Sequence, residues 1–272
     1  MNKILLILIL LLIVGFLFCF VGKTEIAEDI KYGIVFSQRQ SKSLSLDWKE
    51  NYIAILDDLG PKDMKIITQW DLIERDSNIY SFKSLDWQIA EASKKNVNIL
   101  IRIGDCEFPN WLSSDFKKES LSYLNTVILR YEDNPNVTMW ELGFKDCVEE
   151  ALYNSQLDFI KKNSDKPILG FDIDKYSIFK NILSPIFYTR TAIISDKDTV
   201  IETRGGPEGI IYEMTIDQWN QSMNLKTFEK NINYINKVGI DTIYITGSEW
   251  WYLLKTRYED DGIWDYVGSL IK

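Results

Sequence analysis

Short apolar segments and longer amphipathic segments alternate along most of the chain. The apolar segments are rich in Ile, Val, Tyr and Phe, which is typical of buried β-strands. The predicted strands are residues 32–37, 64–70, 98–104, 137–144, 167–172, 186–189, 209–214 and 242–246. Apolar residues at helical spacing between them predict helices over residues 46–59, 85–95, 119–131, 149–163, 225–238 and 263–271. Eight strands that alternate with helices predict an α/β fold, either a (β/α)8 TIM barrel or a doubly wound sheet.

Local signals refine this fold class. The first helix should stop at Gly60-Pro61, and Ser84 is a candidate cap for the second. No Gly-rich phosphate loop follows a predicted strand, which disfavours a nucleotide-binding sheet and favours the barrel. Residues 190–208 are too polar and too broken for a full helix, so we expect a barrel with a reduced sixth helix.

The N-terminus predicts a membrane segment. Residues 4–21 are apolar apart from Gly15 and lie between Lys3 and Lys23. No small-residue cleavage site follows, which favours an uncleaved signal anchor, a transmembrane helix, over a cleaved signal peptide. The predicted parts are an anchor over 1–22, a linker over 23–31 and a barrel over 32–272, with the globular domain outside the cytoplasm.

Composition narrows the chemistry. The 272 residues carry a formal net charge of −9 and include no histidine. The acidic balance argues against nucleic acid as a partner. The absence of histidine excludes Ser-His-Asp and Cys-His catalysis and histidine-ligated zinc. Carboxylates, Lys, Tyr and Cys remain as acid–base candidates, and we expect no cofactor and no metal site.

Two of the three cysteines follow predicted strands. Cys106 comes after the third strand and Cys147 after the fourth, whereas Cys19 lies in the predicted anchor. Because neighbouring strand ends of a barrel lie close together, Cys106 and Cys147 could form a disulfide in an oxidising compartment. Two unrelated free thiols are the alternative.

Acids and tryptophans cluster where predicted strands end. The segments Tyr-Glu-Met-Thr-Ile-Asp-Gln-Trp at 212–219 and Gly-Ser-Glu-Trp-Trp at 247–251 each follow an apolar run. Indole rings stack on the apolar faces of sugars and carboxylates bond their hydroxyls, so carbohydrate is the predicted partner. Core tryptophans and solvated acids are the alternative. The candidate substrate-binding residues are Trp70, Asp71, Trp111, Glu141, Tyr188, Asp217, Trp219, Glu249 and Trp251.

Several motifs together resemble bacterial glycoside-hydrolase-like barrels of the clan A type. They include Tyr-Gly-Ile-Val-Phe-Ser at 32–37, Gln-Trp-Asp-Leu-Ile-Glu at 69–74, Met-Trp-Glu-Leu at 139–142 and Gly-Ser-Glu-Trp-Trp-Tyr at 247–252. The resemblance covers the chain from about residue 32 to its C-terminus. It implies two catalytic glutamates, an acid/base after the fourth strand and a nucleophile at the end of the seventh, in a retaining mechanism.

The chain departs from this pattern at both positions. The Asn-Glu pair that the resemblance implies after the fourth strand is replaced by Phe144-Lys145, and a lysine does not act as the carboxylic acid does. Glu213 occupies the expected nucleophile position, and Asp217 stands where the relatives have a longer acid. A replacement acid could be Glu141, Asp146, Asp105 or Glu107.

Lys145 could instead form an ion pair with Glu213. Two hypotheses follow. One is a membrane-anchored glycosidase of impaired activity that acts on a poly- or oligosaccharide. The other is an inactive barrel that binds a glycan or a protein partner.

Overall fold

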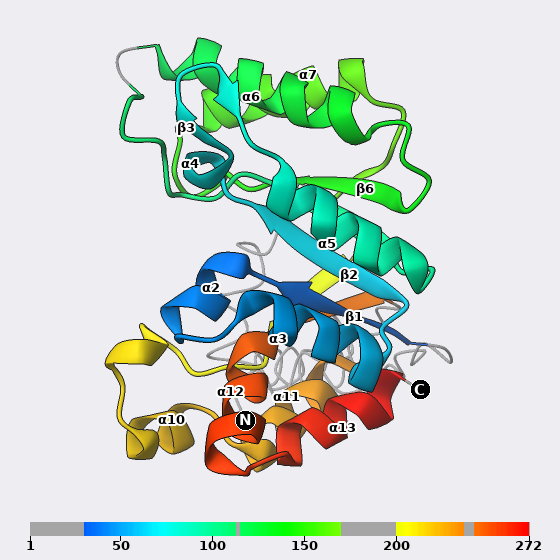
Figure 1. Cartoon of the computed structure of the whole chain (residues 1–272), viewed down its shortest axis with the longest axis vertical. Helices are drawn as coiled ribbons and strands as arrows, with labels where there is room; N and C mark the ends of the chain where they lie inside the picture. The colour runs from blue at the N-terminus through cyan, green and yellow to red at the C-terminus, as the bar shows by residue number, and fades with distance from the viewer. Residues whose placement is uncertain (1–29, 113–114, 170–199, 237–241, 272) are drawn as a thin grey trace, which may run out of the picture. The chain divides into compact units, whose positions relative to one another are not determined.

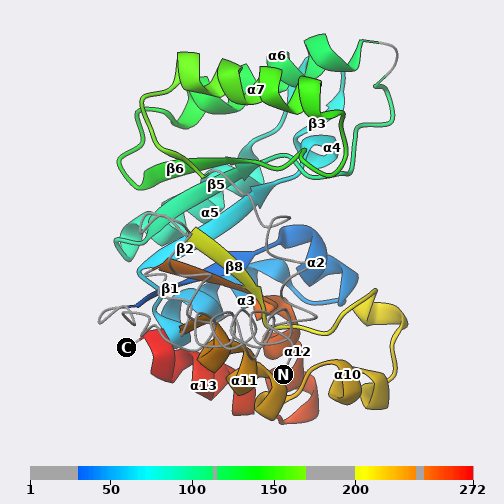
Figure 2. The same cartoon turned by 180° about the vertical axis from the view of Figure 1, so that it is seen from behind.

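The computed structural model describes residues 30–112, 115–169, 200–236 and 242–271 (Figures 1 and 2). The chain divides into two compact units. The larger comprises Tyr32–Gly170, Arg204–Leu225 and Tyr244–Lys272, and the smaller comprises Met1–Lys31, Phe171–Thr203 and Lys226–Ile243. The predicted anchor over 4–21, the predicted sixth strand over 186–189 and Tyr188 lie outside the described residues.

A largely parallel sheet organises the described part of the chain, and its β8 residues 200–203 belong to the smaller unit. The strands are β1 (Lys31–Phe36), β2 (Asp63–Thr68), β5 (Asn98–Ile103), β6 (Val137–Leu142), β7 (Ile168–Leu169), β8 (Val200–Arg204) and β9 (Thr242–Thr246). The sheet order is β7-β6-β5-β2-β1-β9-β8, and the pairs β1–β2, β2–β5, β5–β6 and β6–β7 are parallel. Consecutive neighbouring strands joined through helices are the arrangement that the alternating sequence pattern predicts.

Helices connect the strands. They are α2 (Gln38–Ser43), α3 (Trp48–Ala54), α4 (Trp70–Ile73), α5 (Lys83–Lys94), α6 (Phe116–Tyr131), α7 (Glu150–Asn163), α10 (Ile216–Ser222), α11 (Leu225–Asn236), α12 (Ser248–Tyr258) and α13 (Gly262–Ile271). A π-helical turn η1 (Ile55–Leu59), a 3-10 turn η2 (Ile211–Glu213) and a hairpin of β3 (Glu74–Asp76) with β4 (Ile79–Tyr80) complete the described elements. None of the helices in the described ranges has the length and apolar character needed to cross a membrane.

Local signals explain most helix boundaries. Asp47 caps α3 through the N–H groups of Lys49 and Glu50, and η1 extends this helix to Gly60, which has a φ of 61°. Ser84 was wrong as a cap, because α5 begins one residue earlier and Ser84 lies inside its first turn.

One face of the sheet packs against helices. Figures 1 and 2 both show α3 and α5 along the same face of β1 and β2. Phe36 meets Tyr52 of α3 with ring centroids 4.9 Å apart, and Trp70 stacks on Tyr123 of α6 at 5.0 Å. These large buried side chains form the apolar core between the sheet and its helical layer.

The opposite face carries a buried ion pair. Lys65 of β2 pairs with Glu141 of β6, and their side chains are 0% and 6% exposed. The Arg102 Nε lies 3.5 Å from the second carboxylate oxygen of Glu141, and the Lys65 Nζ lies 5.4 Å from the Tyr244 ring centroid. A charge in such a place is stable only with a partner, so this pair links β2 to β6 across the intervening β5.

The seventh strand differs from its prediction. Residues 209–214 contain η2 rather than a strand, and the chain forms β8 within 190–208, the segment predicted to be irregular. The apolar run was misleading because Ile210 and Tyr212 are 50% and 59% exposed. The Val-Ile-Glu-Thr-Arg segment at 200–204, which contains only two apolar residues, forms the strand beside β9.

We expect Glu141→Gln to destabilise the fold by about 3–5 kcal/mol, because it leaves the Lys65 charge buried without its carboxylate. Urea denaturation measures this loss. The double variant Lys65→Met/Glu141→Leu should lose less than the single one, since it removes both charges. A single-variant loss below about 1 kcal/mol would contradict a buried, paired Lys65.

Candidate functional site

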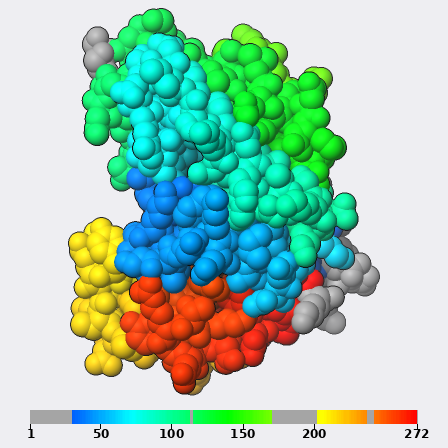
Figure 3. Space-filling model, viewed as in Figure 1, coloured from blue at the N-terminus to red at the C-terminus, as the bar shows by residue number. Residues whose placement is uncertain are grey.

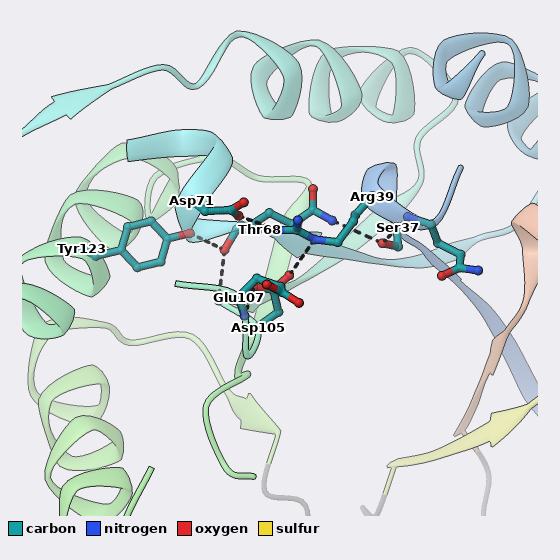
Figure 4. A network of polar contacts seen from close by, with 10 residues as sticks. Ser37, Arg39, Thr68, Asp71, Asp105, Glu107 and Tyr123 are labelled. Carbon is teal, nitrogen blue, oxygen red and sulfur yellow. Dashed lines mark hydrogen bonds and ion pairs between the residues drawn. The ribbon is translucent and has the colours of Figure 1, made fainter. Parts of the chain in front are cut away.

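Polar side chains meet where β1, β2 and β5 end. We call Ser37, Arg39, Gln69, Asp71 and Asp105 the strand-end cluster (Figure 4). Each of these residues comes shortly after the end of a strand. The carboxyl ends of parallel strands lie on one edge of a sheet, so the side chains come together there. In α/β barrels this edge holds the binding and catalytic groups.

Arg39 bridges two carboxylates in this cluster. Its guanidinium pairs with Asp71, and its Nε lies 3.6 Å from an oxygen of Asp105. The side chains of Arg39, Asp71 and Asp105 are 35%, 24% and 20% exposed, so a ligand can reach them. Burial raises the pKa of Asp105 to about 6, and the Arg39 charge opposes this rise. Asp105 is therefore a carboxyl that can exchange a proton near neutral pH.

Ser37 connects the cluster to Glu249. The Gln69 amide donates to the Ser37 hydroxyl at 3.3 Å, and the Ser37 N–H donates to the Glu249 carboxylate. Glu249 is 3% exposed, and burial raises its pKa to about 7. Hydrogen bonds from Ser37, from its own N–H and from Ser248 oppose the rise. Glu249 is therefore a second carboxyl that titrates near neutral pH, and Ser37 links it to the cluster.

A glycine positions Glu249 at the first turn of α12. Gly247 has a φ of 103°, and a Cβ there would lie 2.7 Å from the Gly206 nitrogen. Only glycine allows both the backbone conformation and this close approach. The sequence identified the Gly-Ser-Glu-Trp-Trp motif but did not predict that a helix begins within it.

The position after the fourth strand is filled by an aromatic ring. Phe144 is fully buried, and a Cβ on Gly104 would lie 2.2 Å from its ring. The ring faces Trp70 and Phe108 at centroid distances of 5.8 and 6.0 Å. Lys145 follows in a turn and is half-buried. Glu141, the preceding acid on this strand, is held by Lys65 rather than exposed to a ligand.

Three predicted sugar platforms are buried core residues, and that prediction was wrong. Trp70 and Trp251 are fully buried and Trp219 is nearly so. An internal acceptor for each indole N–H removes the cost of burying this donor. These acceptors are the Glu74 carboxylate, the Gly205 carbonyl and the Ile211 carbonyl respectively. Their exposed faces are too small for a sugar to stack on.

The other predicted residues have mixed placements. Trp111 is half-buried and donates to the Glu74 carbonyl at 2.8 Å, and Asp217 is exposed on α10. Glu213 is exposed at the end of η2, and its ion pair with Lys145 stays a prediction. Trp140 and Trp250 are buried core residues, which agrees with the alternative that tryptophans belong to the core.

Sequence reasoning missed Glu202. This residue lies on β8, two residues before the strand ends at Arg204, and it belongs to the smaller unit. The strand before β9 is β8 and not the predicted strand over 209–214. Glu202 is the acid on β8, and the resemblance implies an acid on this strand as the nucleophile. The available signal was an acid between a Val-Ile pair and the Gly-Gly at 205–206.

Cys106 and Cys147 are joined by a disulfide, with their Cα atoms 5.5 Å apart. It ties the loop after β5 to the loop after β6, and therefore holds the chain on either side of Asp105 and Lys145. In the described ranges, no group of three or more His, Cys, Asp or Glu side chains is placed to hold a metal ion.

Comparisons with known proteins address the fold. No protein-family model and no curated protein matches the chain. A GH5_18 structure from Streptomyces cattleya in complex with GlcNAc matches at 11% identity and TM-score 0.54, over 81% of this chain and 70% of that one. A GH5_18 structure from Bifidobacterium longum subsp. longum matches at 10% identity and TM-score 0.52, over 80% and 70%. A family 39 glycoside hydrolase from Bacteroides cellulosilyticus WH2 matches at 15% identity and TM-score 0.37, over 52% of this chain and only 31% of that enzyme.

The two GH5_18 matches, at very low identity, show that the chain has an α/β barrel-like fold similar to that of these structures. The resemblance inferred from the strand motifs is therefore confirmed at the level of the fold. Because function depends on the site rather than on the fold, they leave the activity to be argued from the strand-end residues.

We expect Glu249 to make the stability of the fold depend on pH. Its folded pKa lies above the unfolded value, so the native state binds the extra proton, and stability falls as pH rises from about 4.5 to about 7. Relative to wild type, Glu249→Gln should gain about 3 kcal/mol between pH 4.5 and pH 8. Urea denaturation at both pH values measures this, with the exposed Glu259→Gln as control. Equal pH dependence in wild type and Glu249→Gln would contradict a buried, protonated Glu249.

The disulfide should contribute to stability through the 41-residue separation that it closes. Replacing both cysteines by serine should cost about 3–4 kcal/mol in urea denaturation, from the loop entropy of the unfolded chain. Cys19→Ser is the control and should leave stability unchanged. Thiol titration of the denatured, unreduced protein should detect one free thiol, and three would exclude the disulfide.

Proposed function

We propose that the chain is a carbohydrate-binding barrel that uses the strand-end cluster and does not perform retaining hydrolysis. The observation that carries this proposal is the cluster itself. A guanidinium, two carboxylates, an amide and a hydroxyl lie together on the edge of the sheet where barrels bind ligands.

The chemistry of these groups suits sugar hydroxyls. Asp71 and Asp105 accept hydrogen bonds from hydroxyl groups, and Arg39 donates to them. Because Arg39 already pairs with both acids, the cluster is ordered before a ligand arrives, which lowers the entropy cost of binding. GlcNAc is bound in one GH5_18 structure of similar fold, which supports the ligand class.

The fourth strand argues against retaining hydrolysis. That mechanism needs a carboxylic acid to protonate the leaving oxygen and a carboxylate to attack. Lys145 occupies the acid position, Phe144 beside it is buried, and Glu141 is neutralised by Lys65. A lysine ammonium does not supply the raised-pKa carboxyl that the reaction uses.

One observation favours a second function, glycosidic bond hydrolysis with a relocated acid. Asp105 has a pKa of about 6, which is suitable for a general acid, and its carboxyl is partly exposed. The nucleophile would then be Glu213, and Glu213→Gln tests this role. This alternative predicts turnover that Asp105→Asn abolishes.

We further propose that residues 4–21 anchor the chain in a membrane, with the barrel outside the cytoplasm. The disulfide between Cys106 and Cys147 supports an oxidising compartment. Fractionation tests the anchor: the full chain should remain in the membrane fraction after a high-salt or carbonate wash, and a chain released by such a wash would exclude it.

The binding proposal predicts that the full-length chain binds oligosaccharides in calorimetry but releases no aryl group from β-glycosides. Arg39→Gln should weaken binding about tenfold or more, because it removes a charge-assisted hydrogen-bond donor. Arg130→Gln, which alters a cation outside the cluster, is the matched control. Turnover by wild type that Asp105→Asn abolishes would instead establish the hydrolase, and binding unaffected by Arg39→Gln would exclude the cluster as the site.

A further inference from the structure

A second candidate ligand site is a pocket on the helical side of β2, next to the strand-end cluster residue Gln69, which lines it. It has a volume of about 260 Å³ and is lined by residues of α2, the end of β2, α4, the β3–β4 hairpin and α5. Figure 3 shows the surface hollowed between the blue segment that contains α2 and the cyan segment that follows β2. Thr68 in its wall accepts from the Tyr123 hydroxyl of α6 at 2.8 Å, which places this wall on the helical face of the sheet.

The floor of the pocket contains buried amides. Gln38, Gln69 and Gln88 all line it and are 8%, 5% and 3% exposed. The Gln88 amide nitrogen donates to the Ser84 carbonyl at 3.2 Å, but the Gln88 side-chain oxygen has no partner among the described residues. A buried acceptor without a donor is costly, so the pocket offers an acceptor that a ligand hydroxyl would satisfy.

The rim of the pocket is cationic. Lys42 and Arg75 line it and are exposed, and no carboxylate is among the lining residues. A guanidinium and an ammonium among the lining residues favour an anion. The volume is smaller than that of pockets for drug-sized ligands, which limits the occupant to a small molecule.

We propose that this pocket binds a hydroxylated anion of the size of a single sugar ring, either a sugar acid or a sugar phosphate. The anionic group pairs with Lys42 and Arg75 at the rim, and the ring hydroxyls bond the glutamine amides at the floor. The pocket shares Gln69 with the strand-end cluster, but Arg39, Asp71 and Asp105 do not line it. Gln88, Lys42 and Arg75 lie outside the cluster, so variants of these residues test the pocket separately.

Calorimetric titration of the full-length chain tests this with four probes: glucuronate, glucose 6-phosphate, glucose and inorganic phosphate. At least one sugar anion should bind tenfold or more tightly than both glucose and phosphate, and which one binds distinguishes a carboxylate from a phosphate. Absence of binding by both sugar anions would overturn the proposal. Glucose or phosphate that binds as tightly as the sugar anions would also overturn it.

Variants locate the binding within the pocket. Gln88→Leu should weaken the binding of the sugar anion at least tenfold, and Lys42→Gln, at the exposed rim where folding is not at risk, should weaken it at least threefold. Lys62→Gln, an exposed lysine outside the pocket, is the matched control and should change nothing. Equal loss in Lys42→Gln and Lys62→Gln would show general charge attraction and overturn the assignment.

Discussion

The buried ion pair between Lys65 and Glu141 constrains the sheet on which the candidate site is built. Each charge loses several kcal/mol of hydration on burial, and only the partner compensates this loss. Because side chains alternate along a strand, the two charges meet only in one register of β2, β5 and β6. A slip of one residue in β2 would turn Lys65 toward the helices and Met64 toward Glu141. The ion pair and the apolar alternation therefore select the same pairing.

The same principle of matched charge explains what the strand ends can do. Glu141 is neutralised within the sheet, and Arg39 bridges Asp71 and Asp105 at its edge. Phe144 packs into an aromatic cluster at the position for which the sequence resemblance implies an asparagine before the acid. The edge thus presents a preorganised polar surface in which the carboxylates of Asp71 and Asp105 are both paired with Arg39.

The sequence predicted most of the framework because its strongest patterns coincide with buried elements. The strand over 242–246 and the start of the strand at 98 agree with the structure, and the helix over 149–163 is one residue too long at its start. β8 was missed because its five residues are half polar, and 209–214 was chosen because Ile210 and Tyr212 look like core although they are exposed. The tryptophans were misassigned because the sequence does not reveal which indole N–H groups find internal acceptors. The strand-end cluster also depends on contacts between residues 32 or more positions apart, which a local pattern cannot specify.

Two buried groups bear on the proposal that this chain binds a ligand. Stable cores avoid acids that ionise near neutral pH and acceptors that lack donors, because both reduce the stability of the native state. Glu249 is such an acid, directly behind the strand-end cluster, and Gln88 is such an acceptor, in the floor of the second pocket. Glu249 accepts hydrogen bonds from Ser37 and Ser248, whereas the Gln88 oxygen has no donor among the described residues. A ligand is therefore the first physical explanation to examine for Gln88. The Gln88 oxygen belongs to the lining of the pocket, whereas Trp70, Trp219 and Trp251, whose indole N–H groups have internal acceptors, lie in the core.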